Sequence, residues 1–389
     1  MPGKLGRHFL QIPGPTNVPD RVLKAMSRPV IDHRGPEFSA MATSILARLK
    51  PVFKTSGPVL LSPSSGTGGW EAALVNTLSP GDKVLMFETG QFAVLWRDVA
   101  QRLGIDVVWV HGDWRHGAQP EVTAKMLAAD KGQRIKAVCV VHNETSTGVA
   151  SRIPEIRAAI DSVNHPALLL VDTVSSLGSI DFRHDEWGVD VTIACSQKGL
   201  MLPPGLGLNA LSAKAMVASK TAKCPRSYWD WASMLKFNSD GFFPYTPVTS
   251  LLYALDEALT MLDEEGLENV FARHNRLAAA TRAAVAAWGL ENLCQDEREF
   301  SSVLTAVMMP EGKNADDLRK LILERFNMSL GAGLGKVQGK VFRIGHLGEL
   351  SELSLLGAIS GVEMGLSLAG VPFKKGGVDA AMAYLAGNG

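Results

Sequence analysis

The chain has 389 residues, of which 46% are hydrophobic and 20% are charged, a composition typical of a soluble globular protein large enough for two domains. Lysine plus arginine and aspartate plus glutamate both number 39, so the formal net charge is zero, and no basic stripe or charged block stands out. These features argue against nucleic acid or an anionic membrane as the main partner.

The N-terminal segment "MPGKLGRHFLQIPGPTNVP" has no apolar stretch of the kind that a signal peptide contains. Its part "IPGPTNVP" is too rich in proline and glycine for a regular element. We therefore predict that residues 1–17 form an extended arm, which lies against one domain or crosses to a partner subunit.

Five short apolar runs predict the strands of a large sheet. They are continuous and do not alternate with polar residues, as expected for parallel strands buried on both faces. The runs are residues 83–88, 106–110, 137–141, 167–172 and 191–196, and residues 70–78, 94–104 and 153–163 between them have helical spacing. The sequence thus predicts a doubly wound α/β sheet, in which ligands bind beyond the carboxyl ends of the strands.

The pattern changes after about residue 255 to long helices mixed with two strand-like segments. The helical segments are residues 252–262, 267–289 and 315–326, the strand-like segments are residues 302–310 and 340–347, and a final helix follows. This α+β pattern predicts two domains, a large α/β domain of residues 18–255 and a small C-terminal domain of residues 256–389.

The most apolar segment near the C-terminus, residues 353–373, contains Glu363 and several glycines. It therefore reads as an amphipathic helix that covers a sheet, and not as a segment that spans a membrane. We expect a cytoplasmic protein, and the four scattered cysteines fit a reducing compartment and give no zinc spacing. No metal ligand set is predicted.

A glycine-rich loop, "SPSSGTGG", runs directly into a helix at residues 62–78. Such a loop directs free backbone N–H groups and the positive end of a helix toward one point, which is a common way to bind phosphate. The loop matches neither GxGxxG nor GxxxxGK[ST], so a plain glycine-rich turn is the alternative.

Two ionisable residues follow predicted strands at the ligand-binding edge. Asp172 ends the run "ALLLVD", where a carboxylate is costly to bury unless a cation or a strong donor meets it; a helix cap is the alternative. Lys198 follows "VTIACS", and a desolvated lysine favours the neutral amine that condenses with a carbonyl; a solvated surface lysine is the alternative. Cys195, nearby, reads as a small apolar filler and not as a nucleophile.

The loop, Asp172 and Lys198 together match one cofactor. Pyridoxal 5′-phosphate needs an anion cradle for its phosphate, a carboxylate opposite its pyridinium nitrogen, and a lysine for its aldehyde. All three groups occur here in that order, and Asp172 and Lys198 lie at the ends of predicted parallel strands.

The wording and order of seven segments also resemble the class V aminotransferases, and within that family the alanine/serine–glyoxylate aminotransferases. The resemblance runs from about residue 11 to residue 348 and implies the aspartate aminotransferase-like fold, fold type I of the pyridoxal phosphate enzymes. The segments are "PGPTNVP", "SSGTGGWEAAL", "HNETSTG", "LLLVDTVSSLG", "SQKGLMLPPG", "YTPVTSLLYAL" and "KVFRIGHLG".

The resemblance implies a role for each residue of the cofactor site. Lys198 would bind the aldehyde, Asp172 would keep the ring nitrogen protonated, and Thr145 would donate to the phenolic oxygen. Four further residues would hold the phosphate or stack on the ring: Gly66, Thr67 and Gln197 in this subunit, with Phe92 where many relatives have tryptophan. Thr246 would reach the phosphate of a neighbouring subunit, so the resemblance implies a homodimer with shared active sites, or a dimer of such dimers.

The resemblance also implies a substrate site. Arg343 would clamp the substrate α-carboxylate, a role that its planar guanidinium suits independently. Gly14, with His33 and Arg34 from the partner subunit, would line the pocket, although the latter two could instead hold an arm by structural hydrogen bonds. Where many relatives have a phosphate-binding tyrosine this chain has Phe243, and Tyr245 is a possible substitute.

The implied activity is transamination by a ping-pong mechanism, from an L-amino acid to glyoxylate to give glycine. "GTGGWE" favours L-serine as the donor, with hydroxypyruvate as product, because the alanine-specific branch typically has a histidine after the first glycine of this loop. Alanine and aspartate stay open as donors. More distant alternatives are a lyase or desulfurase, which would need a mobile cysteine unlike Cys294, and a non-catalytic binding protein on this fold.

Overall fold

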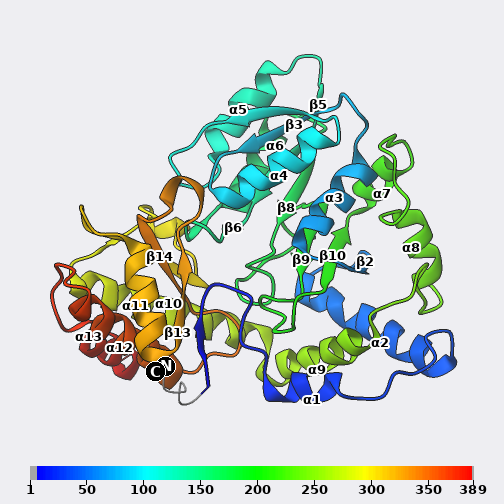
Figure 1. The fold of residues 1–389 in the computed structure, drawn as a ribbon. Helices are drawn as coiled ribbons and strands as arrows, with labels where there is room; N and C mark the ends of the chain where they lie inside the picture. The colour runs from blue at the N-terminus through cyan, green and yellow to red at the C-terminus, as the bar shows by residue number, and fades with distance from the viewer. Residues whose placement is uncertain (1–6, 388–389) are drawn as a thin grey trace.

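The structure, a computed structural model, describes residues 7–387 and contains two main sheets, each with its own helices (Figure 1). The large sheet has seven strands in the order β2-β10-β9-β8-β5-β3-β4, and all are parallel except β10, which runs antiparallel to both of its neighbours. The strands are β2 (Val59–Pro63), β3 (Lys83–Phe87), β4 (Asp106–Val110), β5 (Ile135–Val141), β8 (Leu168–Asp172), β9 (Val191–Cys195) and β10 (Leu206–Leu211).

Helices cover both faces of the large sheet, which confirms the predicted doubly wound α/β architecture. Alternate strand residues face α3, α4, α7 and α8 on one side and α5 and α6 on the other, while α2 and α9 pack near β2 and β10. These helices are α2 (Pro36–Phe53), α3 (Gly66–Thr77), α4 (Gln91–Arg102), α5 (Pro120–Ala129), α6 (Ile153–Ser162), α7 (Ala213–Ser219), α8 (Trp231–Asn238) and α9 (Thr249–Glu265). The five predicted strands are confirmed; β2 and β10 were not predicted.

The small sheet has the order β1-β13-β14-β12-β11 and carries four helices on one face (Figure 1). Its strands are β1 (Phe9–Gln11), β11 (Glu291–Asn292), β12 (Leu304–Met308), β13 (Met328–Ala332) and β14 (Val341–Gly345). Its helices are α10 (Leu267–Trp288), α11 (Ala315–Phe326), α12 (Glu352–Leu368) and α13 (Gly377–Gly387). The remaining elements are α1 (Asp20–Met26), the pair β6 (Asn143–Glu144) and β7 (Val149–Ala150), and the short 3₁₀ turns η1 (Glu297–Glu299) and η2 (Gly335–Val337).

Side-chain alternation along β14 determines which residue reaches the large sheet. Phe342 and Ile344 point into the core under the helices, so Arg343 between them lies on the opposite face of the small sheet. That face packs against Trp114 of the large-sheet region through Val341, Leu304 and neighbouring residues. The arginine is therefore directed away from the helical layer and toward the ends of the large-sheet strands.

The described part of the predicted N-terminal arm lies against the small sheet. Residues 9–11 form β1, which pairs in parallel with β13, and the segment 12–19 contains no helix or strand. Residues 1–6 of the predicted arm lie outside the described residues. The arm does not stay at the small sheet, because after β1 it continues to the carboxyl end of β9, as described below.

The predicted final helix is α12, and its buried residues cover the small sheet as expected. A further helix, α13, was missed; it packs on α10 and α12. Within residues 7–387, no helix is both long and apolar enough to cross a membrane. The proposed domain boundary at residue 255 falls inside α9, which packs along its length with the core of the large-sheet region, so the domain limits stay a prediction.

Ile344→Ala should lower the free energy of unfolding by about 3 kcal/mol, because a buried isoleucine loses its transfer free energy and leaves a cavity. Ile344 is fully buried in the core between the small sheet and its helices, whereas Leu353 at the start of α12 is 81% exposed. Leu353→Ala is therefore the control, with an expected change within about 0.5 kcal/mol. Urea unfolding followed by circular dichroism measures both, and equal losses would contradict the assigned core.

Candidate active site

A cavity of about 160 Å³ lies at the carboxyl ends of the large-sheet strands and brings most of the predicted site together. Residues from the N-terminal arm, the loop before α3, α4 and the ends of β5, β8 and β9 line it. Eight predicted residues are among them: Gly14, Gly66, Thr67, Phe92, Thr145, Asp172, Gln197 and Lys198. These residues come from six separate segments, so the fold and not the chain order makes them neighbours.

The glycine-rich loop ends in the helix that the sequence predicts. Ser65 has an extended backbone and α3 begins at Gly66, so the first N–H groups of the helix have no partners inside it, and Gly66 and Thr67 line the cavity. A Cβ at position 66 would lie 2.5 Å from Cγ2 of Val174, and a Cβ at position 68 would lie 2.7 Å from the Trp229 ring. The backbone thus approaches closely where side chains would block it, which fits an anion held by N–H groups.

Asp172 ends β8 with its side chain buried and held from two directions. The indole N–H of Trp70 donates to Oδ2 at 2.9 Å, and the Val174 backbone N–H donates to Oδ1 at 2.6 Å. Burial raises the pKa of Asp172 to about 7, while these two hydrogen bonds and Lys198 oppose the shift. A carboxyl group with this pKa exchanges its proton readily with a pyridine nitrogen, so it fits the ring of the predicted cofactor.

Lys198 lies in the turn after β9, beneath the N-terminal arm. Its Nζ donates to the Pro13 carbonyl at 2.6 Å, and its side chain is almost entirely buried. Burial lowers the pKa of Lys198 to about 8; among nearby ionisable groups, Cys195 and Asp172 oppose the shift and Arg343 adds to it. Gly14 has φ of +98°, and a Cβ there would lie 2.5 Å from Nζ, so only glycine leaves room for this amine.

Arg343 lies beside the cavity, on the other side of Thr145. Its Nη1 donates to the Thr145 carbonyl at 2.6 Å and its Nε donates to the Ala332 carbonyl at 2.7 Å. The side chain is 7% exposed, and none of its hydrogen bonds goes to a carboxylate. Burial lowers the pKa of Arg343 to about 10, and the Glu144 carboxylate opposes this shift. A buried guanidinium held by carbonyl oxygens retains the charge for a ligand carboxylate.

Two residues that the sequence analysis did not assign complete the cavity wall. Trp70 binds Asp172, as described above, and Asn143 lies beside Thr145. The Ser175 hydroxyl donates to the Asn143 carbonyl, so its oxygen must accept from Nδ2 of Asn143, and this orients the amide. Oδ1 is then buried without a partner among the described residues, which fits a ligand in the cavity. Both residues stand inside quoted motifs, which is the signal that could have found them.

Arg343 lies beside this cavity without lining it, and three further predicted residues do not reach it within the chain. His33 and Arg34 lie before α2 and Thr246 lies before α9; none of them lines the cavity, and Arg34 and Thr246 are exposed. Phe243 packs edge-on against Phe38 in the core, and the ring of Tyr245 stacks on Tyr228, so neither lines the cavity. The sequence had assigned His33, Arg34 and Thr246 to the neighbouring subunit, and that assignment stays a prediction.

The four cysteines are all buried and unpaired. Burial raises the pKa of both Cys195 and Cys294 to about 12, so neither is a thiolate at neutral pH. This agrees with Cys195 as a structural residue. Within residues 7–387, no group of three or more metal-ligating side chains comes together.

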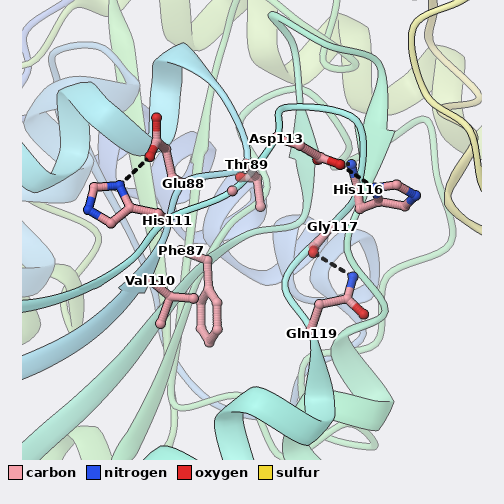
Figure 2. A pocket seen from close by; sticks show the side chains of 10 residues that line it. Phe87, Glu88, Thr89, Val110, His111, Asp113, His116, Gly117 and Gln119 are labelled. Carbon is pink, nitrogen blue, oxygen red and sulfur yellow. Dashed lines mark hydrogen bonds and ion pairs between the residues drawn. The ribbon is translucent and has the colours of Figure 1, made fainter.

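A second, more open cavity of about 520 Å³ lies at the ends of β3 and β4 (Figure 2). It contains two acid–histidine pairs, His111 with Glu88 and His116 with Asp113, and Figure 2 shows them on separate sides of the opening. None of the predicted site residues lines it. It is therefore not the site that the sequence analysis predicts.

Comparison with known proteins decides the family. Residues 8–342 match the family "Aminotransferase class-V". The chain belongs to the class V aminotransferases. It is 53% identical to the serine–glyoxylate aminotransferase of Methylorubrum extorquens, over 98% of this chain and 97% of the relative. It is 48% identical to the L-aspartate–glyoxylate aminotransferase of Paracoccus denitrificans, over 96% and 95% of the two chains.

Among solved structures, the ureidoglycine–glyoxylate aminotransferase of Bacillus subtilis superposes with a TM-score of 0.90 at 27% identity, covering 99% of this chain and all of the other. The fold is that of the fold type I pyridoxal phosphate enzymes, as the sequence predicts, and the cofactor of this class V aminotransferase is pyridoxal 5′-phosphate. The residues present fit that cofactor, with a backbone cradle at Gly66, a carboxyl group at Asp172 and an amine at Lys198.

The apoenzyme should combine with pyridoxal 5′-phosphate at a rate that rises with pH through about 8, because only the neutral Nζ of Lys198 attacks an aldehyde. The pKa is lowered from 10.5, so the neutral amine is populated at a lower pH than in an exposed lysine. Stopped-flow absorbance between about pH 6 and about pH 12 measures this midpoint. A midpoint near 10.5 would show that the amine is not desolvated.

Proposed function

We propose that this aminotransferase transfers the amino group of L-serine to glyoxylate, giving hydroxypyruvate and glycine by a ping-pong mechanism. One observation carries the proposal. The buried amine of Lys198 and the buried carboxyl group of Asp172 line one cavity, and beside it lies the guanidinium of Arg343, which makes no hydrogen bond to a carboxylate of the described residues. The similarity to a serine–glyoxylate aminotransferase at 53% identity supports serine as the donor. Aspartate is the second candidate donor, supported by the 48% identity to an aspartate–glyoxylate enzyme.

The bound cofactor supplies an electron sink for the bond electrons at the donor's Cα. We assign the remaining chemistry to three side chains. Asp172 holds the proton shared with the ring nitrogen, and Trp70 fixes the direction of that carboxyl group. Nζ of Lys198 takes the proton from Cα and returns a proton in the second half of the reaction, which its lowered pKa favours near neutral pH. Phe92 and Val174 line the cavity and exclude water from the reacting atoms.

We assign the carboxylate clamp to Arg343 in both half-reactions, because L-serine and glyoxylate share a carboxylate. The carbonyl oxygens of Thr145 and Ala332 hold two of the guanidinium's nitrogens, so the fork has a fixed direction before a ligand arrives. We assign the phosphate to Gly66, Thr67 and Gln197, and the phenolic oxygen to Thr145. Gly14 lies over Lys198, where it would border the substrate.

We further propose that the working unit is a cytoplasmic homodimer, or a dimer of such dimers, with shared active sites. His33, Arg34 and Thr246 lie outside the cavity of their own chain, as residues donated to a neighbouring subunit would. Four buried, unpaired cysteines fit a reducing compartment.

The desulfurase alternative loses support because Cys294 is 2% exposed and its burial raises the thiol pKa to about 12. Such an enzyme needs a reactive, accessible thiolate. A non-catalytic binding protein is the remaining alternative, and it would have no need for a desolvated amine opposite a carboxyl group of raised pKa.

The assay that tests the proposal follows glycine formation from glyoxylate with L-serine, L-alanine and L-aspartate as donors. L-serine should give the highest kcat/KM. A higher value for L-aspartate would overturn the donor, and no turnover with any of the three would overturn the function.

Lys198→Ala should reduce turnover by at least about a thousandfold, because the general acid–base group is lost. Retained turnover in a pure variant would exclude Lys198 as that group.

Arg343→Lys should raise KM about ten- to a hundredfold for both the donor and glyoxylate, because a lysine keeps the charge but cannot form two parallel hydrogen bonds. The substitution also removes the guanidinium's hydrogen bonds to the carbonyls of Thr145 and Ala332, which hold the side chain in its direction. Steady-state kinetics with each substrate varied in turn measures both constants. A rise for one substrate alone would contradict a common clamp.

A further inference from the structure

Glu144 is a fully buried carboxylate beside the cavity that no assigned role uses. Its two oxygens accept four hydrogen bonds: from the N–H of Phe92 at 3.3 Å, from the N–H of Ala93 at 3.1 Å, and from the N–H and hydroxyl of Ser146 at 3.0 and 2.6 Å. All of these partners are donors, so the surroundings match a carboxylate acceptor and not a neutral amide or a hydrocarbon.

The first contact of this carboxylate is with the N-terminus of α4. The cap residue of α4 is Gly90, which has no side chain to accept a bond, and the N–H groups of Gln91, Phe92 and Ala93 need partners. The Ser146 hydroxyl accepts from Gln91 at 2.9 Å, and Glu144 accepts from the other two. A Cβ at position 90 would lie 2.6 Å from the Glu144 carboxyl carbon, so glycine there permits the approach. An anion at this end of a helix is also favoured by the helix dipole.

The second contact fixes the turn that contains Thr145. Glu144 binds both donors of Ser146, so the backbone of the residue between them is held in one conformation. Thr145 lines the cavity, and its carbonyl accepts from Arg343. Glu144 thus orients the ring of Phe92 by binding the backbone N–H of that residue. By holding the turn at Thr145, it also orients the Thr145 hydroxyl and the Thr145 carbonyl that binds Arg343.

The charge of Glu144 acts on the same groups. It raises the pKa of Arg343, which opposes the larger lowering by burial. It also raises the pKa of Asp172, in the same direction as the larger effect of burial. Within residues 7–387, no hydrogen bond joins Glu144 to the side chain of Arg343 or of Asp172, so this effect is electrostatic and operates across the low-dielectric interior.

We propose that Glu144 is a positioning residue of the active site, which holds the ring-stacking Phe92, Thr145 and the carboxylate clamp Arg343 in register through the N-terminus of α4. The proposal rests on the function proposed above for those three residues. It goes beyond that function in assigning the arrangement of the cofactor and substrate subsites to one side chain that touches neither ligand.

Glu144→Gln tests the proposal, since glutamine keeps the volume but presents an NH₂ group to donors. The dissociation constant of pyridoxal 5′-phosphate from the apoenzyme, measured by tryptophan fluorescence, should rise about tenfold, and KM for L-serine and glyoxylate should rise about tenfold. Wild-type values for all three constants would overturn the proposal.

Glu363 provides a matched control, because its carboxylate also caps the N-terminus of a helix other than its own. Its carboxylate accepts from the N–H groups of Gly376 and Val378 at the start of α13 and from the indole of Trp288, within the helical layer of the small sheet. Glu363→Gln should lower the melting temperature by an amount similar to Glu144→Gln and leave the cofactor and substrate constants within twofold of wild type. Equal changes of these constants in both variants would show that Glu144 has a structural role only.

Ser146→Ala is the second variant, for the case in which Glu144→Gln does not fold. It removes one donor to Glu144 and the acceptor of the Gln91 N–H, so the same three constants should rise about two- to threefold. Unchanged constants would overturn the proposal. The cofactor titration of the apoenzyme is independent of turnover, so a wild-type enzyme inactive with all donors would refute the proposed function without deciding the role of Glu144.

Discussion

Burial of charged groups at one edge of the large sheet is the constraint on which this active site depends. The parallel pairing of β8 and β9 places Asp172 and the turn with Lys198 at the same edge, and both side chains are almost entirely buried there. Desolvation disfavours both charged forms, so the pKa of the carboxyl rises to about 7 and that of the amine falls to about 8. The two groups thereby titrate close to neutral pH, where proton exchange with a substrate or a cofactor is least costly.

The N-terminal arm connects the small sheet to this edge. β1 adds a strand to β13, and a few residues later the Pro13 carbonyl accepts from Nζ of Lys198 while the Thr16 N–H donates to the Gln197 carbonyl. Gly14 lies between these contacts without a side chain, which leaves space for the lysine. The same small sheet supplies Arg343, so both its edge strand and its cavity-facing side contribute to one site.

Sequence reasoning predicted the residues whose chemistry depends on local position. The strands 167–172 and 191–196 were predicted from continuous apolar runs, and the ends of parallel strands necessarily meet at one edge, so Asp172 and Lys198 were expected together. Trp70 and Asn143 were not assigned, because their roles depend on contacts with Asp172, 102 positions from Trp70, and with Ser175. β10 was missed because the residues of a strand do not by themselves show that it pairs in antiparallel. α13 was missed because it follows α12 after only a short loop.

By itself the sequence determined the α/β class and the cofactor, and it predicted Lys198 as the amine and Asp172 as the carboxyl group, because hydrophobic periodicity and residue chemistry are properties of short segments. The tertiary structure decided which face Arg343 occupies, which backbone lies over Lys198, and that Glu144 joins α4 to the turn at Thr145. These are contacts between segments up to 198 residues apart in the chain, and only packing of the two sheets brings them within hydrogen-bond distance. His33, Arg34 and Thr246 lie outside the cavity of their own chain, so their proposed part in the site rests on the proposed dimer.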